Sequence, residues 1–557
     1  MWGATLAASW RSAGSSLSKT RAGLKPGCRH ECRPHKNRMS WQPEIDEIRR
    51  REELARLMGG SANVERTHTA GRLTVRERID RLLDPGTFHE SGALAGQTKY
   101  DAQGILTSFT PSNFVAGTGR IEGRPVVVGG DDFTVRGGAA DASVGNKMGH
   151  AEKLARGMRM PMIRLVDGTG GGGSVKTIET IGRTYVPANP AWDTITAMLG
   201  EVPVIGACLG PVAGLGAVRV VTSHFSLMVR GSSQLFVAGP PVVERGVGEK
   251  VSKEQLGGHE IHARSSGAVD NEVESEDEAF AAIRKFLSYL PSNVWQAPPR
   301  STPEDSPDRR EEDLISIIPR DRRRSYDVRR ILNLVFDRDS FFEIGYYYGR
   351  PVAGGLARLN GYPVGVIAND PRQGGGAPNA PACDKMIRLV DLCDTFHIPV
   401  VNFVDNPGFL IGTAAERAGT VRAGARALVA VYQATTPWIS ILIRRCYGVA
   451  GAGHGNAQGL NLRYAWPSGD WGSLPIEGGV QAAYKRDIES SPDPDARRRA
   501  IEDNLNRFRS PLRTAEAFGI EEIIDPRDTR RLLCEWVEAA YALLPSELGP
   551  KARSCRP

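Results

Sequence analysis

The chain carries an internal repeat, and this repeat constrains its fold more than any other feature. Residues 119–126, GRIEGRPV, recur as ARLNGYPV at 357–364, an offset of 238 residues. The same offset relates further identical residues: Asp132 and Asp370, Gly137-Gly138 and Gly375-Gly376, and Asp167 and Asp405. Chance does not keep one register over about fifty residues, so we expect two homologous domains.

Each copy of the repeat is predicted to alternate strands with helices. Short apolar runs predict strands, and apolar residues spaced by three or four predict helices. In the first copy these segments are a strand at 126–128, a helix at 148–158 and a strand at 162–166. In the second copy they are 364–367, 386–396 and 400–404. This alternation predicts βαβ units, and therefore an α/β fold for each domain.

The repeat and the local composition also suggest domain boundaries. We expect a leader or extension over 1–38, an N-terminal domain over 39–295 and a C-terminal domain over 325–550. Residues 296–324 between them are rich in proline and charge, which is typical of a linker. The leader holds eight basic residues and one acidic residue, which accounts for the whole formal net charge of +7. Net charge therefore gives no sign of a nucleic-acid-binding surface on the domains.

The leader has two interpretations. Its Arg- and Ser-rich, acid-poor composition is typical of a transit peptide, which would place the protein in the mitochondrial matrix. Alternatively, it is an upstream extension of a bacterial cytoplasmic protein that begins at Met39, and the 58 arginines against 13 lysines favour this. The cysteines after Met39 show no disulfide spacing, which suits a reducing compartment. No apolar run reaches the roughly 20 residues of a membrane span.

A glycine-rich loop follows the strand at 162–166. In IRLVDGTGGGGSVK, residues 163–176, four consecutive glycines follow Asp167 within three residues. The order of residues excludes a phosphate-binding P-loop, and the match to a dinucleotide fingerprint is only a richness in glycine. Two interpretations remain: a site built from backbone N–H groups, or close packing of a helix on the sheet.

Each copy has a second loop of small residues after its next apolar strand. The sequences are GPVAG at 210–214 and GVAGAG at 448–453. Small residues let a ligand approach the backbone, where N–H groups can stabilise an oxyanion, although close packing again remains an alternative. The segment HEIH at 259–262 is one residue short of a zinc-binding His-Glu-x-x-His, so it is interpreted as structural and no metal site is predicted.

Taken together, these features resemble the carboxyltransferase (β) subunits of biotin-dependent acyl-CoA carboxylases, such as propionyl-CoA and methylcrotonyl-CoA carboxylase. The resemblance extends from about Trp41 to Gly549. Its motifs are GRLTVRERI at 71–79, DFTV-x-GG at 132–138, GG to SG across 257–267, D-x-PGF at 405–409 and AWP at 465–467. It implies two homologous crotonase-like (ClpP/crotonase) domains of the ββα-superhelix type.

The resemblance also implies an activity. The carboxyl group of carboxybiotin would pass to the α carbon of an acyl-CoA, through a thioester enolate held by backbone oxyanion holes. Acyl-CoA would bind the N-terminal domain, and biotin the C-terminal domain of a neighbouring subunit, typically within a hexamer. The sequence has no Met-Lys-Met biotinylation signature, so a biotin carboxylase/biotin carboxyl carrier (α) subunit would supply the carboxybiotin.

Two alternatives stay open at this point. One is a transcarboxylase or decarboxylase subunit that acts on a malonyl-type CoA, because sequence does not fix the direction of carboxyl transfer. The other is a non-catalytic crotonase-like scaffold.

The resemblance assigns residues to three groups. The catalytic backbone donors are Gly171, Gly172, Val449 and Ala450. The acyl-CoA-binding residues are Gly137, Gly138, Ala139, Gly210, Ala213, Gly214 and Ala452. The biotin-binding residues are Gly375, Gly376, Pro407, Gly408 and Phe409.

Two of these positions depart from the family pattern. Val449 stands where the family often has glycine, so its N–H can serve only if its φ is negative. Ala452 stands where related enzymes carry an Asp or Ile that selects acyl chain length. The small alanine predicts a substrate larger or more branched than acetyl-CoA.

Overall fold

The computed structural model describes residues 40–139, 143–168, 175, 178–179, 182–189 and 191–556. Residues from Arg50 onward form one compact unit, and the chain up to Arg49 forms a separate one. Helix α1 (Gln42–Arg56) begins in the latter. Within the described ranges no helix is both long enough and apolar enough to cross a membrane.

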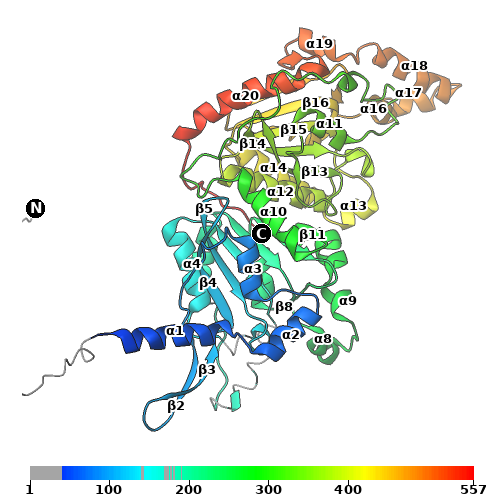
Figure 1. Cartoon of the computed structure of the whole chain (residues 1–557). Helices are drawn as coiled ribbons and strands as arrows, with labels where there is room; N and C mark the ends of the chain where they lie inside the picture. The colour runs from blue at the N-terminus through cyan, green and yellow to red at the C-terminus, as the bar shows by residue number, and fades with distance from the viewer. Residues whose placement is uncertain are drawn as a thin grey trace, which may run out of the picture. The chain divides into compact units, whose positions relative to one another are not determined.

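The first domain is built on a mixed sheet with the strand order β1-β4-β5-β6-β7-β9-β11 (Figure 1). The first three strands pair antiparallel and the others are parallel. Its strands are β1 (His89–Glu90), β2 (Gly96–Tyr100), β3 (Leu106–Pro111), β4 (Phe114–Ile121), β5 (Arg124–Asp131), β6 (Met162–Val166), β7 (Val204–Cys208), β8 (Pro211–Ala213), β9 (Phe225–Val229), β10 (Gln234–Phe236) and β11 (Asn271–Val273). Its helices are α2 (Ser61–Thr69), α3 (Val75–Leu82), α4 (Lys147–Met158), α6 (Trp192–Met198), α7 (Leu215–Val221), α8 (Pro240–Val247), α9 (Lys253–Gly257) and α10 (Glu276–Tyr289).

The second domain repeats this plan in the order β12-β13-β14-β15-β16-β17-β19, with β18 paired to β16. Its strands are β12 (Phe342–Glu343), β13 (Val352–Leu359), β14 (Tyr362–Asn369), β15 (Val400–Asn406), β16 (Trp438–Tyr447), β17 (Asn461–Ala465), β18 (Asp470–Gly472) and β19 (Glu522–Ile523). Its helices are α11 (Val328–Val335), α12 (Ala380–Thr395), α13 (Thr413–Arg417), α14 (Thr420–Gln433), α15 (Gly448–Ala452), α16 (Ile476–Ala483), α17 (Lys485–Glu489), α18 (Pro494–Asn506), α19 (Pro511–Glu516) and α20 (Thr529–Leu543).

The predicted segments lie within these elements. The strand expected at 162–166 is β6 to the residue, and the helix expected at 148–158 is α4. In the second copy, β15 extends two residues beyond the predicted 404, and α12 begins at Ala380, six residues before the predicted start. The α/β alternation read from apolar spacing is confirmed.

The repeat is preserved in hydrogen-bond detail. The β4–β5 hairpin turns at Glu122-Gly123 and the β13–β14 hairpin turns at Asn360-Gly361, and all four residues have positive φ. Tight hairpins need this conformation at both central residues. One carboxylate binds both N–H groups of each turn, at 2.9 and 2.8 Å from Asp84 and at 3.0 and 2.8 Å from Asp337.

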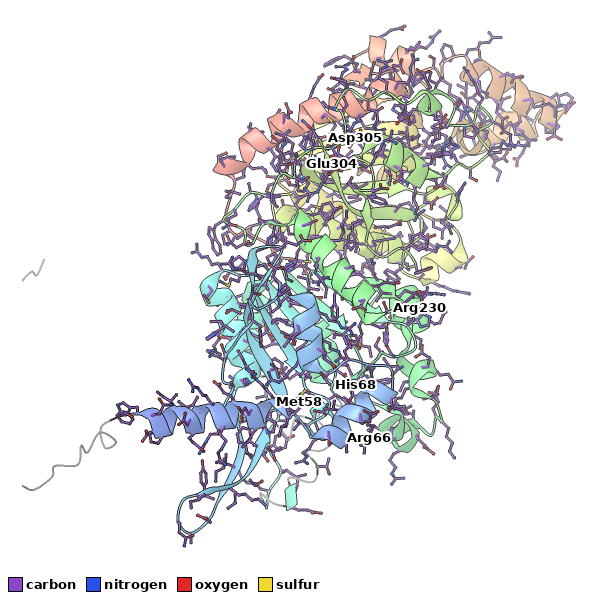
Figure 2. The ribbon with its side chains drawn as sticks, viewed as in Figure 1. Met58, Arg66, His68, Arg230, Glu304 and Asp305 are labelled. Atoms are coloured by element: carbon purple, nitrogen blue, oxygen red, sulfur yellow. The ribbon has the colours of Figure 1, made fainter. Side chains whose placement is uncertain are left out.

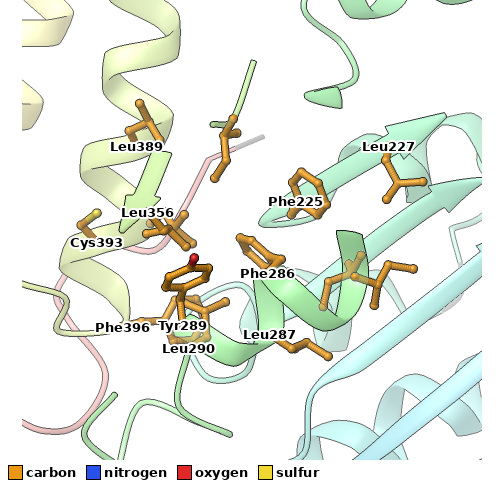
Figure 3. Packing of buried hydrophobic residues seen from close by; sticks show 14 of the residues in the cluster. Phe225, Leu227, Phe286, Leu287, Tyr289, Leu290, Leu356, Leu389, Cys393 and Phe396 are labelled. Carbon is orange, nitrogen blue, oxygen red and sulfur yellow. The ribbon is translucent and has the colours of Figure 1, made fainter. Parts of the chain in front are cut away.

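The two sheets share one hydrophobic core, centred on α10. Figure 3 shows Tyr289 and Leu290, at the end of α10, beside Leu356 and Phe396 of the second domain. Phe225 of β9 stacks on Phe286 with ring centroids 4.8 Å apart. A shared, close-packed core fixes the sheets relative to each other within the unit that begins at Arg50.

The expected linker at 296–324 lies packed against the second domain, where Figure 2 labels Glu304 and Asp305. Leu314 is buried in the core of that domain. Arg309 donates to the carbonyls of Leu334 and Phe336, which close the end of α11. The domain boundaries at 295 and 325 stay predictions.

Candidate functional site

Each domain places an aspartate at the end of the central strand of its sheet. Asp167 directly follows β6, and Asp405 lies in β15. Both side chains are completely buried. These aspartates are related by the 238-residue offset, so the duplicated fold brings each of them to the same edge of its sheet. The surrounding charges then decide what each carboxylate does.

Asp167 is held by two arginines from the start of the first domain. Arg72 Nη1 lies 2.9 and 2.8 Å from the two carboxylate oxygens, and Arg78 Nη1 lies 2.9 Å from Oδ2. Arg78 also donates to Glu276 and to the Leu209 carbonyl. A fully buried carboxylate that is compensated by two arginines in this way is a structural anchor.

Asp405 is held by a different set of donors. Arg444 Nη2 lies 2.8 Å from Oδ2, Arg445 Nε lies 2.6 Å from Oδ1, and the Tyr326 hydroxyl donates to Oδ2 at 2.9 Å. Burial alone would raise the pKa of Asp405, but the hydrogen bonds and charges of the two arginines lower it below the usual value. Asp405 is therefore ionised and, like Asp167, acts as an anchor.

The paired glycines next to these anchors have a structural reason to be glycine. Gly138 and Gly376 both have positive φ, +65° and +81°. A Cβ on Gly138 would lie 2.7 Å from the Asp167 carbonyl oxygen, and a Cβ on Gly376 would lie 2.8 Å from that of Asp405. Each glycine turn therefore packs directly on the peptide of its strand-end aspartate. Their predicted roles in binding acyl-CoA and biotin remain predictions.

The second small-residue loop of the first domain, residues 210–214, is also held by contacts within the protein. A Cβ on Gly210 would lie 2.0 Å from Asp167 Oδ1, so the ion pair with Arg72 requires glycine there. Ala213 donates its N–H to the Gly168 carbonyl at 3.3 Å, and Gly214 donates to the Phe236 carbonyl at 3.0 Å. These N–H groups are not free to bind a ligand. Ala139 is buried and accepts a hydrogen bond from Asn113.

The corresponding loop of the second domain has free donors. Val449 and Ala450 lie in the short helix α15, and neither N–H donates to a described residue. Val449 is absent from the residues with positive φ, so the condition set by the sequence is met. Its side chain is 65% exposed, which leaves the adjacent backbone open to a ligand. The matching predicted pair, Gly171 and Gly172, lies outside the described residues.

Gly408 and Phe409 of the expected biotin site lie in the second domain, and so does Ala452 of the expected acyl-CoA site. Gly408 has φ of +110° and donates to Asn406 Oδ1 at 3.0 Å, which shapes the turn after β15. The Phe409 ring packs on Gly424 of α14. Ala452 is exposed at the end of α15, and its carbonyl accepts from Tyr432.

A cleft with a basic lining opens beside Asp167. Its volume is about 520 Å³, and it is bordered by α2, by the turn before α3 and by the glycine turn at Gly137. Arg72, Arg136, Lys253 and Arg66, which Figure 2 labels on α2, supply its positive charge. The Arg72 guanidinium lies 4.4 Å from the Phe133 ring while it pairs with Asp167.

A cysteine and a histidine also meet in this region, but they do not form a nucleophilic pair. Cys446 Sγ lies 3.7 Å from His454 Nδ1. That nitrogen is already 2.7 Å from the Gly451 carbonyl, and burial raises the pKa of the Cys446 thiol to about 12. A thiol with such a pKa is not ionised at neutral pH. The described residues contain no cluster that could hold a metal ion.

Asp131, the last residue of β5, is a point where the two domains differ chemically. Asp131 accepts the Asp167 N–H at 3.2 Å, just as Asn369 accepts the Asp405 N–H at 3.2 Å. Asn369 also donates from Nδ2 to the Gly376 carbonyl, and a carboxylate has no proton for that bond. Burial raises the pKa of Asp131 to about 6, although the charge of Arg219 opposes the shift.

We therefore expect Asp131→Asn to stabilise the protein at neutral pH. A carboxyl with a raised folded pKa contributes stability below the unfolded value near 4, and that contribution is lost as pH rises through about 6. The gain in unfolding free energy should be about 1–3 kcal/mol at pH 7.5 and roughly half as large at pH 5. Urea unfolding at both pH values measures it, with Asn369→Asp as the reverse exchange; equal gains at the two pH values would contradict it.

Sequence reasoning missed the charged residues that organise the site. Arg72 and Arg78 lie inside the quoted motif at 71–79, but no role was predicted for them. Arg444 and Arg445 directly follow an apolar strand run, and two consecutive cations at the end of a buried strand are a signal that could have found them. No pattern in the sequence signals that Lys253 borders the same cleft.

Comparison with known proteins agrees with this arrangement. Residues 66–549 match the carboxyl transferase domain family. The propionyl-CoA carboxylase carboxyltransferase subunit of Haloferax mediterranei is 34% identical over 89% of this chain and 95% of its own length. The methylmalonyl-CoA carboxyltransferase 12S subunit of Propionibacterium freudenreichii subsp. shermanii is 32% identical over 89% and 93%.

A solved structure gives the same result for the fold. Transcarboxylase 12S, a hexamer solved with methylmalonyl-coenzyme A and methylmalonic acid bound, has a TM-score of 0.81 and 29% identity over 92% of this chain and 97% of its own. This confirms the expected fold of two crotonase-like domains. Since the family match spans most of the sequence and the relatives align over nearly their whole length, the chain belongs to the carboxyl transferase domain family.

Proposed function

We propose that the protein is the carboxyltransferase subunit of a biotin-dependent acyl-CoA carboxylase. It moves a carboxyl group between carboxybiotin and the α carbon of an acyl-CoA. One observation carries this function: the family match over residues 66–549 spans both copies of the duplicated site. A reaction between two separate ligands needs two sites, and a duplicated domain supplies them.

The first domain supports the binding of acyl-CoA. Coenzyme A carries several phosphate charges, and the cleft of about 520 Å³ beside Asp167 is lined by four cationic side chains. Arg66 and Lys253 are exposed there and form no ion pair with a described residue. Arg72 is fixed by Asp167, so one positive charge is held in place before a ligand arrives.

Loss of the two exposed cations is expected to weaken acyl-CoA binding without slowing the chemistry. The double variant Arg66→Gln/Lys253→Gln should raise the KM for acyl-CoA about tenfold and leave kcat within about twofold, since it removes binding common to ground and transition states. Steady-state kinetics at low salt measure this. The same acyl group on a pantetheine thioester, which lacks the nucleotide phosphates, is the control. An equal effect on both substrates would show that the cations do not bind phosphate.

The second domain supports the binding of biotin. The residues that fit this cofactor are the unpaired N–H donors of Val449 and Ala450, the turn at Gly375 and the half-buried ring of Phe409. When bound, biotin carried on a partner chain supplies the carboxyl group and the base. The protein then has to hold negative charge on oxygen and exclude water, which backbone N–H groups do without a titrating side chain. Gly171 and Gly172 are proposed for the same task toward the enolate oxygen.

The direction of transfer is the main alternative. A relative named for methylmalonyl-CoA carboxyltransferase aligns as fully as one named for propionyl-CoA carboxylase, so a transcarboxylase or decarboxylase subunit uses the same architecture. The alternative of a non-catalytic scaffold is disfavoured by the relatives, because those that align over nearly their whole length are named as carboxylase or carboxyltransferase subunits.

Decarboxylation of a malonyl-type CoA tests the function directly. The full chain is incubated with malonyl-CoA or methylmalonyl-CoA and free biocytin, and release of the decarboxylated acyl-CoA is followed by chromatography. Biocytin-dependent turnover supports a carboxyltransferase. That turnover does not fix the direction, so a second assay supplies ATP, bicarbonate, a biotin carboxylase partner and the uncarboxylated acyl-CoA: carboxylation there identifies the carboxylase, whereas turnover only of the malonyl-type CoA identifies the transcarboxylase or decarboxylase. A chain inactive in every combination would be the scaffold.

The partners follow from the same assignment. We propose a biotin carboxylase/biotin carboxyl carrier (α) subunit as the source of carboxybiotin, and a homo-oligomer of the hexameric kind that the transcarboxylase 12S structure names. In such an assembly the two domains of one site come from neighbouring subunits. We expect a cytoplasmic location in a bacterium, or the mitochondrial matrix where residues 1–38 act as a transit peptide.

The acyl group of the substrate is expected to be larger than an acetyl group. Ala452 is small and exposed, and the adjacent Gly451 and Gly453 add no side-chain volume. Rates on acetyl-, propionyl-, methylcrotonyl- and longer acyl-CoAs measure the preference. Replacement of Ala452 by isoleucine should shift the preference toward shorter chains, while a strict preference of the unmodified protein for acetyl-CoA would contradict the prediction.

A further inference from the structure

Each domain pairs its equivalent buried aspartate with an arginine, but the two arginines extend toward different parts of the structure. In the first domain, Arg72 extends from Asp167 into the basic cleft. In the second domain, Arg445 extends from Asp405 to the glycine turn on the opposite side of the strand end. The strand pairing aligns Cys208 of β7 with Leu442 of β16, which places Pro211 where Arg445 stands. Proline has no side-chain donor, so the first domain cannot make this second contact. The difference is specific to the domain proposed to bind biotin.

Arg445 connects three segments that the biotin site needs. Its backbone N–H donates to Asp405 Oδ1 at 3.1 Å, and its Nε donates to the same oxygen at 2.6 Å. Its Nη2 donates to the Gly375 carbonyl at 2.6 Å. Arg445 lies in β16, three residues before Gly448, which opens the turn with the free N–H groups of Val449 and Ala450. One side chain therefore fixes the strand end, the glycine turn and the donor turn relative to one another.

The glycine turn needs such a contact. Gly374, Gly375 and Gly376 all have positive φ, between +55° and +81°. Three consecutive glycines lose more backbone entropy on ordering than any other residues, so the turn is held only by the contacts it makes. Its internal hydrogen bonds run from the N–H of Gly376 to Gln373 and from the N–H of Ala377 to Gly374. The bond from Arg445 adds a charged donor to the carbonyl at its centre.

The guanidinium also keeps part of its edge open. Arg445 is 22% exposed, in contrast to Asp405, which is completely buried. Within the described chain its Nη1 donates no hydrogen bond, and this atom lies on the Gly375 side of the group, 3.8 Å from where a Cβ of that glycine would stand. A partly exposed guanidinium with a free N–H edge fits a carboxylate.

We propose that Arg445 is the positioning residue of the biotin side: it holds the Gly374–Gly376 turn and leaves Nη1 for the carboxylate that biotin carries. This rests on the proposed function, because it deepens the assignment of biotin to the second domain. Arg72 has the corresponding place on the acyl-CoA side. The two arginines should therefore affect different substrates.

Two variants and two measurements test this. Arg445→Gln removes the charge, whereas Arg445→Lys keeps a cation beside Asp405 but cannot donate to Asp405 and Gly375 together. In the decarboxylation assay with the full chain, Arg445→Gln should raise the KM for biocytin at least tenfold and leave the KM for the acyl-CoA within about twofold. Arg72→Gln should show the reverse pattern. An active Arg445→Gln variant with an unchanged KM for biocytin overturns the proposal.

Hydrogen exchange gives a readout that does not depend on activity. In both Arg445 variants the amides of Gly376 and Ala377 should exchange at least tenfold faster than in the unmodified protein. The equivalent amides of Gly138 and Ala139 form the same two turn bonds and should be unchanged, so they serve as the internal control. Unchanged exchange at Gly376 and Ala377 overturns the positioning role. Faster exchange in a protein without carboxyltransferase activity keeps the positioning role and rejects the proposed function and the carboxylate contact.

Discussion

Replacement of Asp167 by alanine is expected to lower the free energy of unfolding by about 3–5 kcal/mol. Arg78 is 1% exposed and shares its guanidinium between Asp167 and Glu276. Without Asp167, the buried positive charge of Arg78 keeps only part of its compensation, and Arg72 loses the one carboxylate that it contacts among the described residues. Urea unfolding monitored by circular dichroism measures the loss.

An exposed ion pair is the matched control for this variant. Asp487 pairs with Arg497 at 2.7 Å, but both side chains are more than 40% exposed. Asp487→Ala should therefore leave the free energy of unfolding nearly unchanged, because solvent screens an exposed pair. If Asp167→Ala cost no more than this control, the buried pair would not be an anchor. Asp405→Ala should resemble Asp167→Ala, because Arg444 is 4% exposed beside it.

Replacement of Val449 by proline is expected to reduce kcat about 100- to 1000-fold. Proline removes the N–H but fits the first turn of a helix, where that N–H has no helical partner, and Val449 is the second residue of α15. The expected loss is therefore one oxyanion donor rather than a folding defect. Steady-state decarboxylation measures kcat, and the KM for the acyl-CoA should change little because that ligand binds the other domain.

Val449→Ala is the control for the side chain. It keeps the N–H and removes only exposed apolar surface, so its kcat should stay within about twofold of the unmodified protein. A proline variant that retains more than half of the activity would falsify the assignment of this donor. Equal losses in the proline and alanine variants would point to the valine side chain instead.

The sequence determined the architecture because its information is periodic and duplicated. Apolar spacing located β6 and α4 closely, since burying an apolar face is a local property of a strand or helix. The 238-residue offset predicted that each element would occur twice, and the hairpin turns capped by Asp84 and Asp337 show how closely the copies agree. The motifs also identified the family correctly.

The tertiary structure decided what the motif residues do. Glycines that the sequence assigned to ligand binding, such as Gly138 and Gly210, are glycine because the peptide of Asp167 and the Arg72 ion pair occupy the space of a side chain. Contacts of this kind join residues about a hundred positions apart, and no local pattern records them.

The same holds for the charges around the two aspartates. Sequence placed Asp167 and Asp405 as equivalent residues, but only the folded chain shows that one is paired from the start of α3 and the other from the neighbouring strand. The physical reason is that a buried carboxylate accepts a cation from any element that packs against it. The sequence thus predicted the positions of the two buried aspartates in the fold, and long-range electrostatic contacts decided which cations pair with each of them.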